Sequence, residues 1–188
     1  NNCTNDINEW TGIFRELLEM FDVRLSDEKL YTSLYKKSLE GNPDCGGILV
    51  CNYLAGEEIT HMNLGRPIII RRPDSNFNLA NFLHSQLYAA IATLRIGVSI
   101  LEQEGVNIYS MVGHGGFFKT PVVGQKYMAN ALQVPVVCME TTGEGGPYGM
   151  ALLAAYLVYK NEGESLEEYL TDRVFVDTAC SGIFPGSE

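Results

Sequence analysis

Residues 110–157 read SMVGHGGFFKTPVVGQKYMANALQVPVVCMETTGEGGPYGMALLAAYL. Apolar runs at residues 108–112 and 134–139 are typical of buried strands, and a glycine turn at residues 113–116 follows the first run. A helical pattern comes after each strand, the first one opening at Thr120-Pro121. Strands that alternate with helices of this length predict an α/β domain, with helices packed on a largely parallel sheet.

The rest of the chain continues this alternation in both directions. Apolar residues recur at helical spacing in several segments, and apolar runs bounded by glycine or proline predict strands. Helices are expected over residues 7–21, 30–39, 78–103, 120–132, 147–159 and 166–170, and further strands over residues 47–53 and 67–71. The tail, residues 177–188, contains glycine and proline and is expected to fray.

Length and composition describe one globular domain. The 188 residues are 46% hydrophobic and 19% charged, which excludes a disordered chain. Size scaling predicts a folded surface of roughly 9,000 Å². The net charge of −10 argues against a large nucleic-acid interface, which needs clustered lysine and arginine. Because no apolar run reaches the roughly 18 residues that cross a bilayer, no membrane span is predicted.

The first residues and the cysteines bear on the cellular compartment. The first ten residues are polar and lack the basic and apolar regions of a signal peptide. The five cysteines, an odd number, include no C-x-x-C pair, so we expect reduced thiols and a cytoplasmic protein. The chain begins with Asn1 rather than with methionine, and we interpret it as a piece of a longer protein.

The segment GHGGFFKT, Gly113 to Thr120, holds the residues best suited to bind a ligand. Glycines let the backbone approach a ligand closely, and the amides at the start of a helix attract anions. Lys119 adds a positive charge, and Thr120 is expected as the helix N-cap with Pro121 as the first helical residue. Glycine is also common in plain strand–helix connections, so an anion site and a structural turn both stay open.

Two well-known phosphate loops do not fit this segment. A P-loop requires G-x-x-x-x-G-K-S/T, and Phe118 stands where the second glycine would wrap a phosphate. The dinucleotide fingerprint G-x-G-x-x-G fails at the same residue, although Gly113 and Gly115 match its first two glycines. A phosphate or nucleotide loop of another kind remains open.

Other conspicuous residues have simpler explanations. The stretch from Gly143 to Ala151 opens a helix in which Gly149 is expected to pack closely and Glu144 to cap the turn. His84 is expected as a half-buried histidine with hydrogen-bond partners, whereas His114, in the glycine turn, remains a candidate for ligand contact. The histidines share no metal-ligand spacing, so no metal site is predicted in this chain.

Several short motifs occur in a definite order along the chain. They are the Y-L-x-G-E turn at residues 53–57, the glycines Gly115 and Gly116 before a helix with Thr120 and Gln125, and the E-x-x-x-x-G-x-A helix start with Glu144, Gly149 and Ala151. This order resembles the C-terminal lobe of the FGGY-family carbohydrate kinases, most closely the xylulokinase-type branch. The resemblance covers residues 47–160, with weaker similarity back to Trp10.

Departures from the family pattern are typical of a divergent branch. The family's G-x-G after the Y-L-x-G-E turn is poorly kept between Gly65 and Arg71. Ser85-Gln86 stands where the long helix usually carries a Glu-Gly pair, and His114 stands where the strand often ends in aspartate. These differences bear most on the identity of the sugar.

The resemblance implies an actin-like ATPase lobe with a ribonuclease-H-like fold, in which a mixed sheet is flanked by helices. Residues 1–188 would form the C-terminal lobe, which binds ATP, while the sugar and the general base belong to an N-terminal lobe outside this chain. Mg²⁺ would accompany the phosphates, held largely by groups outside this chain. The full protein would be an ATP-dependent kinase of a ketose or polyol similar to xylulose, while this chain alone would be inactive. Homodimers are common among such kinases, so the resemblance leaves a homodimer open.

The resemblance also implies the residues of the nucleotide site. Gly115 and Gly116 would lay their backbone against the phosphates and ribose, Thr120 would hydrogen-bond the nucleotide and Lys119 would reach a phosphate. At the start of the first helix, the residues bordering the adenine would be Asn5, Asn8 and Glu9.

Two other functions are compatible with such a lobe. A non-catalytic nucleotide-binding or interaction module would use the same fold, and a lobe that only packs on a partner would bind no nucleotide. A different actin-like ATPase, such as a relative of acetate kinase or of a chaperone, would lack the Y-L-x-G-E turn, so residues 53–57 count against it.

Overall fold

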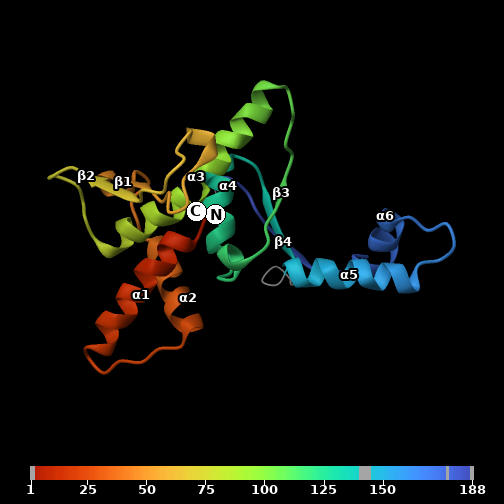
Figure 1. Ribbon diagram of the computed structural model, residues 1–188, viewed down its shortest axis with the longest axis horizontal. Helices are drawn as coiled ribbons and strands as arrows, with labels where there is room; N and C mark the ends of the chain where they lie inside the picture. Colours follow the sequence, from red (N-terminus) through yellow and green to blue (C-terminus); the bar gives the residue numbers. More distant parts are fainter. Residues whose placement is uncertain (1–2, 140–144, 177, 187–188) are drawn as a thin grey trace.

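The computed structural model describes residues 3–139, 145–176 and 178–186 (Figure 1). Its helices are α1 (Asn5–Glu19), α2 (Asp27–Ser38), α3 (Leu79–Gln103), α4 (Val123–Leu132), α5 (Gly145–Tyr159) and α6 (Leu166–Tyr169). Its strands are β1 (Ile48–Cys51), β2 (Ile68–Arg71), β3 (Met111–Val112), β4 (Val136–Met139) and β5 (Cys180–Ile183). Each predicted helix and strand is present with shifted ends, and β5 is an additional strand.

Side-chain caps explain where two of the central helices begin. At the start of α2, the Ser26 hydroxyl accepts a hydrogen bond from the Lys29 amide at 3.3 Å. At the start of α3, the Asn78 side-chain oxygen accepts one from the Asn81 amide at 2.9 Å. Both caps satisfy amides that lack a partner within the helix.

The strands form two small sheets. In the first, β1 pairs with β2 in antiparallel orientation. In the second, β3 pairs with β4 in parallel, and β4 pairs with β5 in antiparallel orientation. The mixed α/β class is therefore confirmed, but the expectation of a largely parallel sheet is wrong, because β3–β4 is the only parallel pair among the described residues.

The strand β5 also corrects the expectation that the tail frays. Its residues pair with β4 in a register that places Ile183 opposite Val136. Gln125 of α4 reinforces this pairing, since its side-chain amide donates to the Val136 carbonyl at 3.2 Å and to the Ser181 carbonyl at 2.8 Å. The amide thus ties both strands to the buried face of α4.

The core gathers around α3, which contacts α1, α2 and α4. One buried cluster joins these helices to the turn after β3; its members are Ile7, Tyr35, Leu87, Ile91, Phe117, Val123 and Tyr127. A second cluster lies between α2, α3 and β1; its members are Leu30, Leu34, Ile48, Val50, Phe82, Leu83 and Ala89. Trp10 packs against the second cluster, with its ring 4.8 Å from that of Phe82. The first cluster fixes the turn after β3 on the helices.

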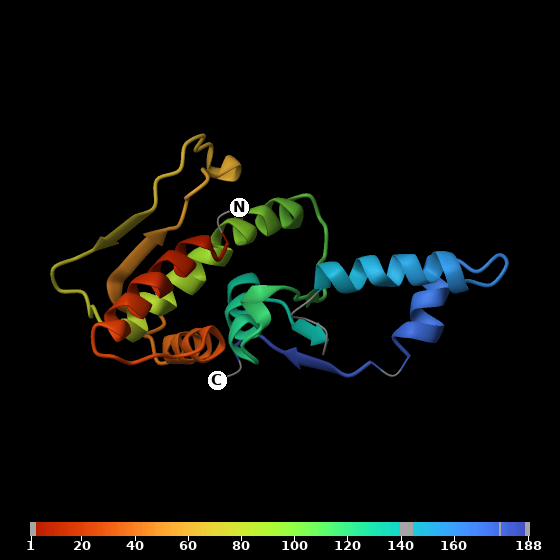
Figure 2. The ribbon, with the colours of Figure 1, turned by 60° about the horizontal axis from the view of Figure 1, so that its bottom comes forward.

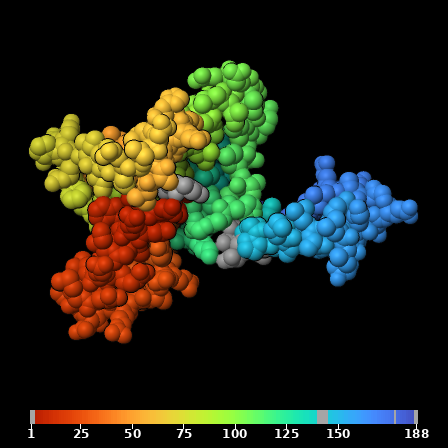
Figure 3. All heavy atoms as spheres, viewed as in Figure 1, coloured from red at the N-terminus to blue at the C-terminus, as the bar shows by residue number. Residues whose placement is uncertain are grey.

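The segment from α5 to α6 projects from the rest of the molecule as an arm (Figures 1, 2 and 3). None of the fifteen residues of α5 is buried. The expected close packing at Gly149 is wrong, because a Cβ atom there would meet nothing within 4 Å. The accessible surface is 11716 Å², well above the roughly 9,000 Å² expected for a compact protein of this size.

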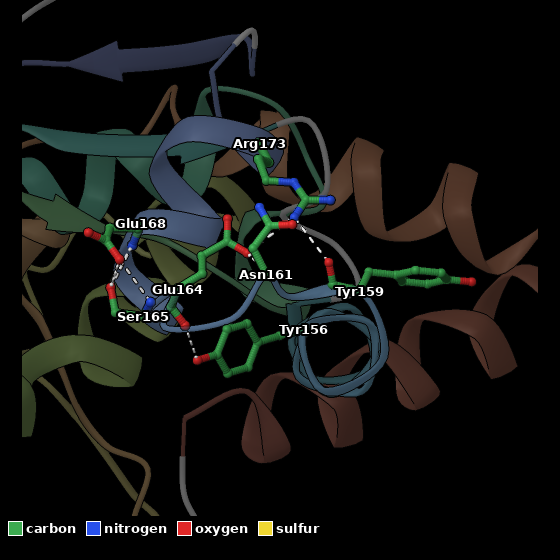
Figure 4. A network of polar contacts seen from close by, with 7 residues as sticks. All are labelled: Tyr156, Tyr159, Asn161, Glu164, Ser165, Glu168 and Arg173. Carbon is green, nitrogen blue, oxygen red and sulfur yellow. Dashed lines mark hydrogen bonds and ion pairs between the residues drawn. The ribbon is translucent and has the colours of Figure 1, made fainter.

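Polar contacts hold the arm together (Figure 4). The Arg173 guanidinium donates to the Tyr159 carbonyl at 3.1 Å and pairs with Glu164 at 3.2 Å. Ser165 and Glu168 form a capping box at the start of α6. Glu144, the other expected cap, lies outside the described residues. Within the part of the chain that the structure describes, no helix is both long and apolar enough to cross a bilayer.

Candidate functional site

The turn after β3 exposes bare backbone. Gly115 has a φ of 96°, which favours glycine, and Gly116–Phe118 form one 3₁₀ turn. The Phe118 amide donates to the Gly115 carbonyl at 3.0 Å and the Lys119 amide to the Gly116 carbonyl at 3.2 Å. A Cβ atom at Gly115 or Gly116 would meet nothing within 4 Å, so this backbone faces open space. Such a turn leaves room for a ligand to approach the main chain.

The turn is anchored by Phe117. Its side chain is buried in the cluster around α3, and its carbonyl oxygen lies 2.3 Å from where a Cβ atom of Gly124 would stand. Only glycine allows the first turn of α4 to pack so closely on the 3₁₀ turn. The packing of Phe117 thus holds the adjacent backbone of Gly115 and Gly116 in place.

Thr120 is not the helix cap that the sequence predicted. The helix α4 begins at Val123, and the N-cap position belongs to Val122, whose φ is 73°. Because Phe117 is packed against Gly124, the chain uses residues 119–122 to pass from the turn into the helix. Thr120 is buried, with 4% of its surface exposed, and it lines a cavity instead.

That cavity lies between the start of α1, one face of α2 and the turn after β3. Its volume is about 840 Å³. Four residues named from the sequence line it: Asn8 of α1, and Gly116, Lys119 and Thr120 of the turn and its exit. The fold thus brings together residues that are more than a hundred positions apart in the sequence.

The remaining predicted residues lie beside or outside this cavity. Gly115 immediately precedes the lining residue Gly116. Asn5 and Glu9 are exposed on α1 but are not among the residues that line the cavity. His114 is exposed and is not among the lining residues. Its ring lies beside the start of α5, only 2.8 Å from where a Cβ atom of Gly145 would stand.

One wall of the cavity comes from α2, for which the sequence predicted a helix but no site residue. Its lining residues follow one helical face and are Asp27, Glu28, Tyr31, Thr32 and Tyr35. The spacing of four between the two tyrosines was the available signal, since it places both on the same side of a helix. The spacing alone could not show that this side faces α1 and the turn.

Hydrogen bonding and burial define the tyrosines of this wall. The Tyr31 hydroxyl donates to the Asn8 side-chain oxygen at 3.1 Å, which joins α2 to α1 at the cavity. Tyr35 lies deeper, and burial, followed by the neighbouring Cys3 and Tyr31, raises the pKa of its phenol well above the usual value. Tyr35 therefore keeps its proton at neutral pH.

Charges are unevenly distributed around the cavity. Lys119 is the only positively charged residue among the described residues that line it. Asp27 on the α2 wall is paired with Arg15, whose guanidinium nitrogen lies 2.7 Å from its carboxylate oxygen. An anionic ligand would place its negative charge toward Lys119 and away from Asp27 and Glu28.

The described residues contain no group of three or more His, Cys, Asp or Glu side chains that could hold a metal ion.

Comparisons with known proteins show the family. The sequence profile of the FGGY family of carbohydrate kinases, C-terminal domain, matches residues 1–158. No curated protein matches the chain. A solved xylulose kinase from Rhodospirillum rubrum is 17% identical with a TM-score of 0.64, over 95% of this chain and 33% of that protein. Glycerol kinase from Plasmodium falciparum, solved with ADP, is 12% identical with the same TM-score and coverage.

A xyloylose kinase from Brucella ovis is 22% identical with a TM-score of 0.58, over 81% of this chain and 30% of that one. The chain spans about a third of the length of these solved proteins. At this level of identity the likeness shows the fold, which is the actin-like ATPase lobe with helices around small mixed sheets. Because the family profile matches most of its residues, the chain belongs to the FGGY family of carbohydrate kinases and corresponds to the C-terminal domain of that family.

Proposed function

We propose that the cavity between α1, α2 and the turn after β3 binds ATP, and that this chain is the nucleotide-binding lobe of a longer kinase. The whole protein would transfer the γ-phosphate to a hydroxyl group of a ketose or polyol similar to xylulose. The observation that carries the proposal is the convergence of Asn8, Gly116, Lys119 and Thr120 on one cavity. Its volume of about 840 Å³ lies within the usual range for cofactor sites.

The residues of the turn suit the phosphate end of the nucleotide. The backbone at Gly115 and Gly116 has no side chain to keep a phosphate away. Lys119 supplies positive charge, and the hydroxyl of Thr120 supplies a hydrogen-bonding group at the buried side of the cavity. The start of α4 lies just beyond and favours negative charge nearby.

The α1 and α2 walls suit the nucleoside end. Asn8 and Thr32 provide polar groups that can bond to a base or ribose, and Tyr31 provides an aromatic surface. The carboxylates of Asp27 and Glu28 repel phosphate, so the electrostatics favour one orientation of the nucleotide.

Phosphoryl transfer depends mainly on positioning and on stabilisation of charge. In this proposal the chain binds and orients ATP, while the sugar site and the general base belong to the rest of the protein. Mg²⁺ neutralises phosphate charge in such reactions, and we expect most of its ligands outside the described residues. The similarity in fold to a xylulose kinase and to a glycerol kinase solved with ADP is in keeping with a nucleotide-dependent sugar kinase.

The first test is calorimetry of this chain with ATP. The substitution Gly116→Asp places a carboxylate in the cavity without a steric clash, because a Cβ atom there meets nothing within 4 Å. We expect ATP affinity to fall at least tenfold through repulsion of the phosphates.

Gly149→Asp is the matched control, since Gly149 is equally unobstructed but lies on the arm, away from the cavity. It should bind ATP like the unchanged chain. Equal affinity of the Gly116→Asp variant and the control would overturn the proposed site.

A further inference from the structure

Tyr35 is a buried residue of the cavity lining whose hydroxyl is not used within the protein. Its side chain is 4% exposed and packs in the cluster around α3, where its ring meets the Phe117 ring edge to face with centroids 6.3 Å apart. Among the described residues the Tyr35 hydroxyl has no hydrogen-bond partner, and no hydrogen bond contributes to its raised pKa. Because nearly all buried hydroxyls in folded proteins have a partner, this exception calls for a cause.

A second buried tyrosine shows what the hydroxyl of Tyr35 lacks. Tyr127 belongs to the same cluster. Its hydroxyl donates to the Ser38 carbonyl oxygen at 3.0 Å and lies 2.7 Å from Nδ1 of His84. Tyr127 is not among the residues that line the cavity, whereas Tyr35 is. Of these two tyrosines, the one without a partner is therefore the one at the cavity.

The Tyr35 hydroxyl is also accessible from the cavity. Among the described residues, the side-chain oxygens that lack a partner and are fully shielded from solvent are Ser75 Oγ and Gln86 Oε1. The Tyr35 oxygen is not one of them, and Tyr35 lines the cavity. The Thr120 hydroxyl is in the same position, since Thr120 is buried, lines the cavity and has no side-chain hydrogen bond within the described part of the chain. The buried side of the cavity thus carries two hydroxyls without partners in the protein.

We infer that Tyr35 is a ligand-binding residue whose hydroxyl forms a hydrogen bond to the nucleotide in the cavity. This inference rests on the proposed function and adds Tyr35 to the site. A phenol that keeps its proton can donate to an oxygen or nitrogen atom of the ligand, and it adds no negative charge that would repel phosphate. The bound nucleotide supplies the hydrogen-bond partner that the fold withholds.

The test compares Tyr35→Phe with the unchanged chain in two measurements. In calorimetry with ATP we expect the affinity to fall about fivefold, the value of one ordinary hydrogen bond, because the ring stays and only the oxygen is lost. In urea unfolding without nucleotide we expect a free energy of unfolding no lower than that of the unchanged chain, because the lost oxygen had no partner in the protein.

Tyr127→Phe is the matched control, because it removes the same oxygen from a buried tyrosine outside the cavity lining. It should give the opposite pair of results. The free energy of unfolding should decrease, since the hydrogen bond to Ser38 is lost, and the affinity for ATP should stay unchanged.

The outcomes separate this inference from the proposed function. If the unchanged chain binds ATP and Tyr35→Phe binds it equally well, the role of Tyr35 is wrong and the nucleotide site stands. If Tyr35→Phe loses as much stability as Tyr127→Phe, the hydroxyl has a structural role and the inference is also wrong. If the unchanged chain does not bind ATP, the proposed function fails and this inference fails with it.

Discussion

Lys119 follows the 3₁₀ turn and lines the cavity beside Thr120, where the other lining charges are the carboxylates of Asp27 and Glu28. In a protein with a net charge of −10, we propose that a cation at this position favours the approach of a phosphate. A charge-assisted hydrogen bond to phosphate also exceeds a neutral one in strength. The role of Lys119 can therefore be tested separately from the shape of the turn.

The substitution Lys119→Met keeps most of the side-chain length and removes the charge. We expect ATP affinity to fall about tenfold or more, because charged hydrogen bonds contribute roughly 1.5–3 kcal/mol. Calorimetry at low and high salt should also show a weaker salt dependence in this variant than in the unchanged chain.

Lys160→Met is the control for loss of charge alone, since Lys160 lies on the arm over the Tyr156 ring. Unchanged affinity and unchanged salt dependence in Lys119→Met would exclude the contact between Lys119 and phosphate.

Single residues also show what the sequence could and could not predict. Gly116 and Lys119 were predicted from local chemistry, namely backbone access and positive charge, and the structure places both at the cavity, while their contact with a nucleotide stays a prediction. The cap assigned to Thr120 was wrong, because the start of α4 is decided by the tertiary packing of Phe117 on Gly124. Asn8 lines the cavity while Asn5 and Glu9 do not, and this difference depends on how α1 is rotated against α2.

At the scale of elements, α3 and α4 meet through three aromatic rings that support the base of the site. The centroid of the His84 ring lies 4.9 Å from that of Tyr88 and 5.1 Å from that of Tyr127. His84 Nδ1 lies 2.9 Å from the Ser38 carbonyl oxygen and 2.7 Å from the Tyr127 hydroxyl. His84 is thus buried with partners at Nδ1, as expected, although Nε2 has no partner among the described residues.

The burial of His84 predicts a pH-dependent stability. Burial lowers its pKa below the usual value of 6.5, and the hydrogen bond to Ser38 opposes this only in part. Below about pH 6.5 the His84 imidazole therefore binds a proton more readily in the unfolded chain than in the folded chain. The free energy of unfolding consequently decreases as the pH falls. Above that pH the contribution of His84 is fully present.

Urea unfolding at pH 7.5 and pH 5.5 measures this effect. The variant His84→Gln should lose part of the decrease in stability between the two pH values, whereas His61→Gln, which alters an exposed histidine, should keep it. The same decrease in both variants would show that His84 does not cause it.

The elements themselves were largely predictable, but their partners were not. Each helix and strand predicted from the hydrophobic pattern is present in the structure, because this pattern reflects which side chains are buried within an element. Pairing of β5 with β4, which involves contacts between residues about 45 positions apart, left no local pattern in the tail. The face of α2 that lines the cavity was missed for the same reason, since its role depends on α1 and on the turn.

At the scale of the whole molecule, the described residues divide into a packed body and the α5–α6 arm (Figures 2 and 3). The sequence of α5 is apolar around the whole helix, a composition typical of a buried helix, yet Met150, Leu157 and Val158 are each about 70% exposed. Periodicity could not predict this arrangement, because it shows that a helix forms and not what covers it. The proposed nucleotide cavity belongs entirely to the packed body.

A crystal structure of this chain with a non-hydrolysable ATP analogue tests the central claim most directly, because it shows where the nucleotide lies. We predict that the triphosphate lies against the backbone of Gly115 and Gly116 beside Lys119, with the base next to Asn8 and Tyr31. An analogue bound at another place on the molecule, or a cavity that stays empty at a saturating concentration of analogue, would contradict it.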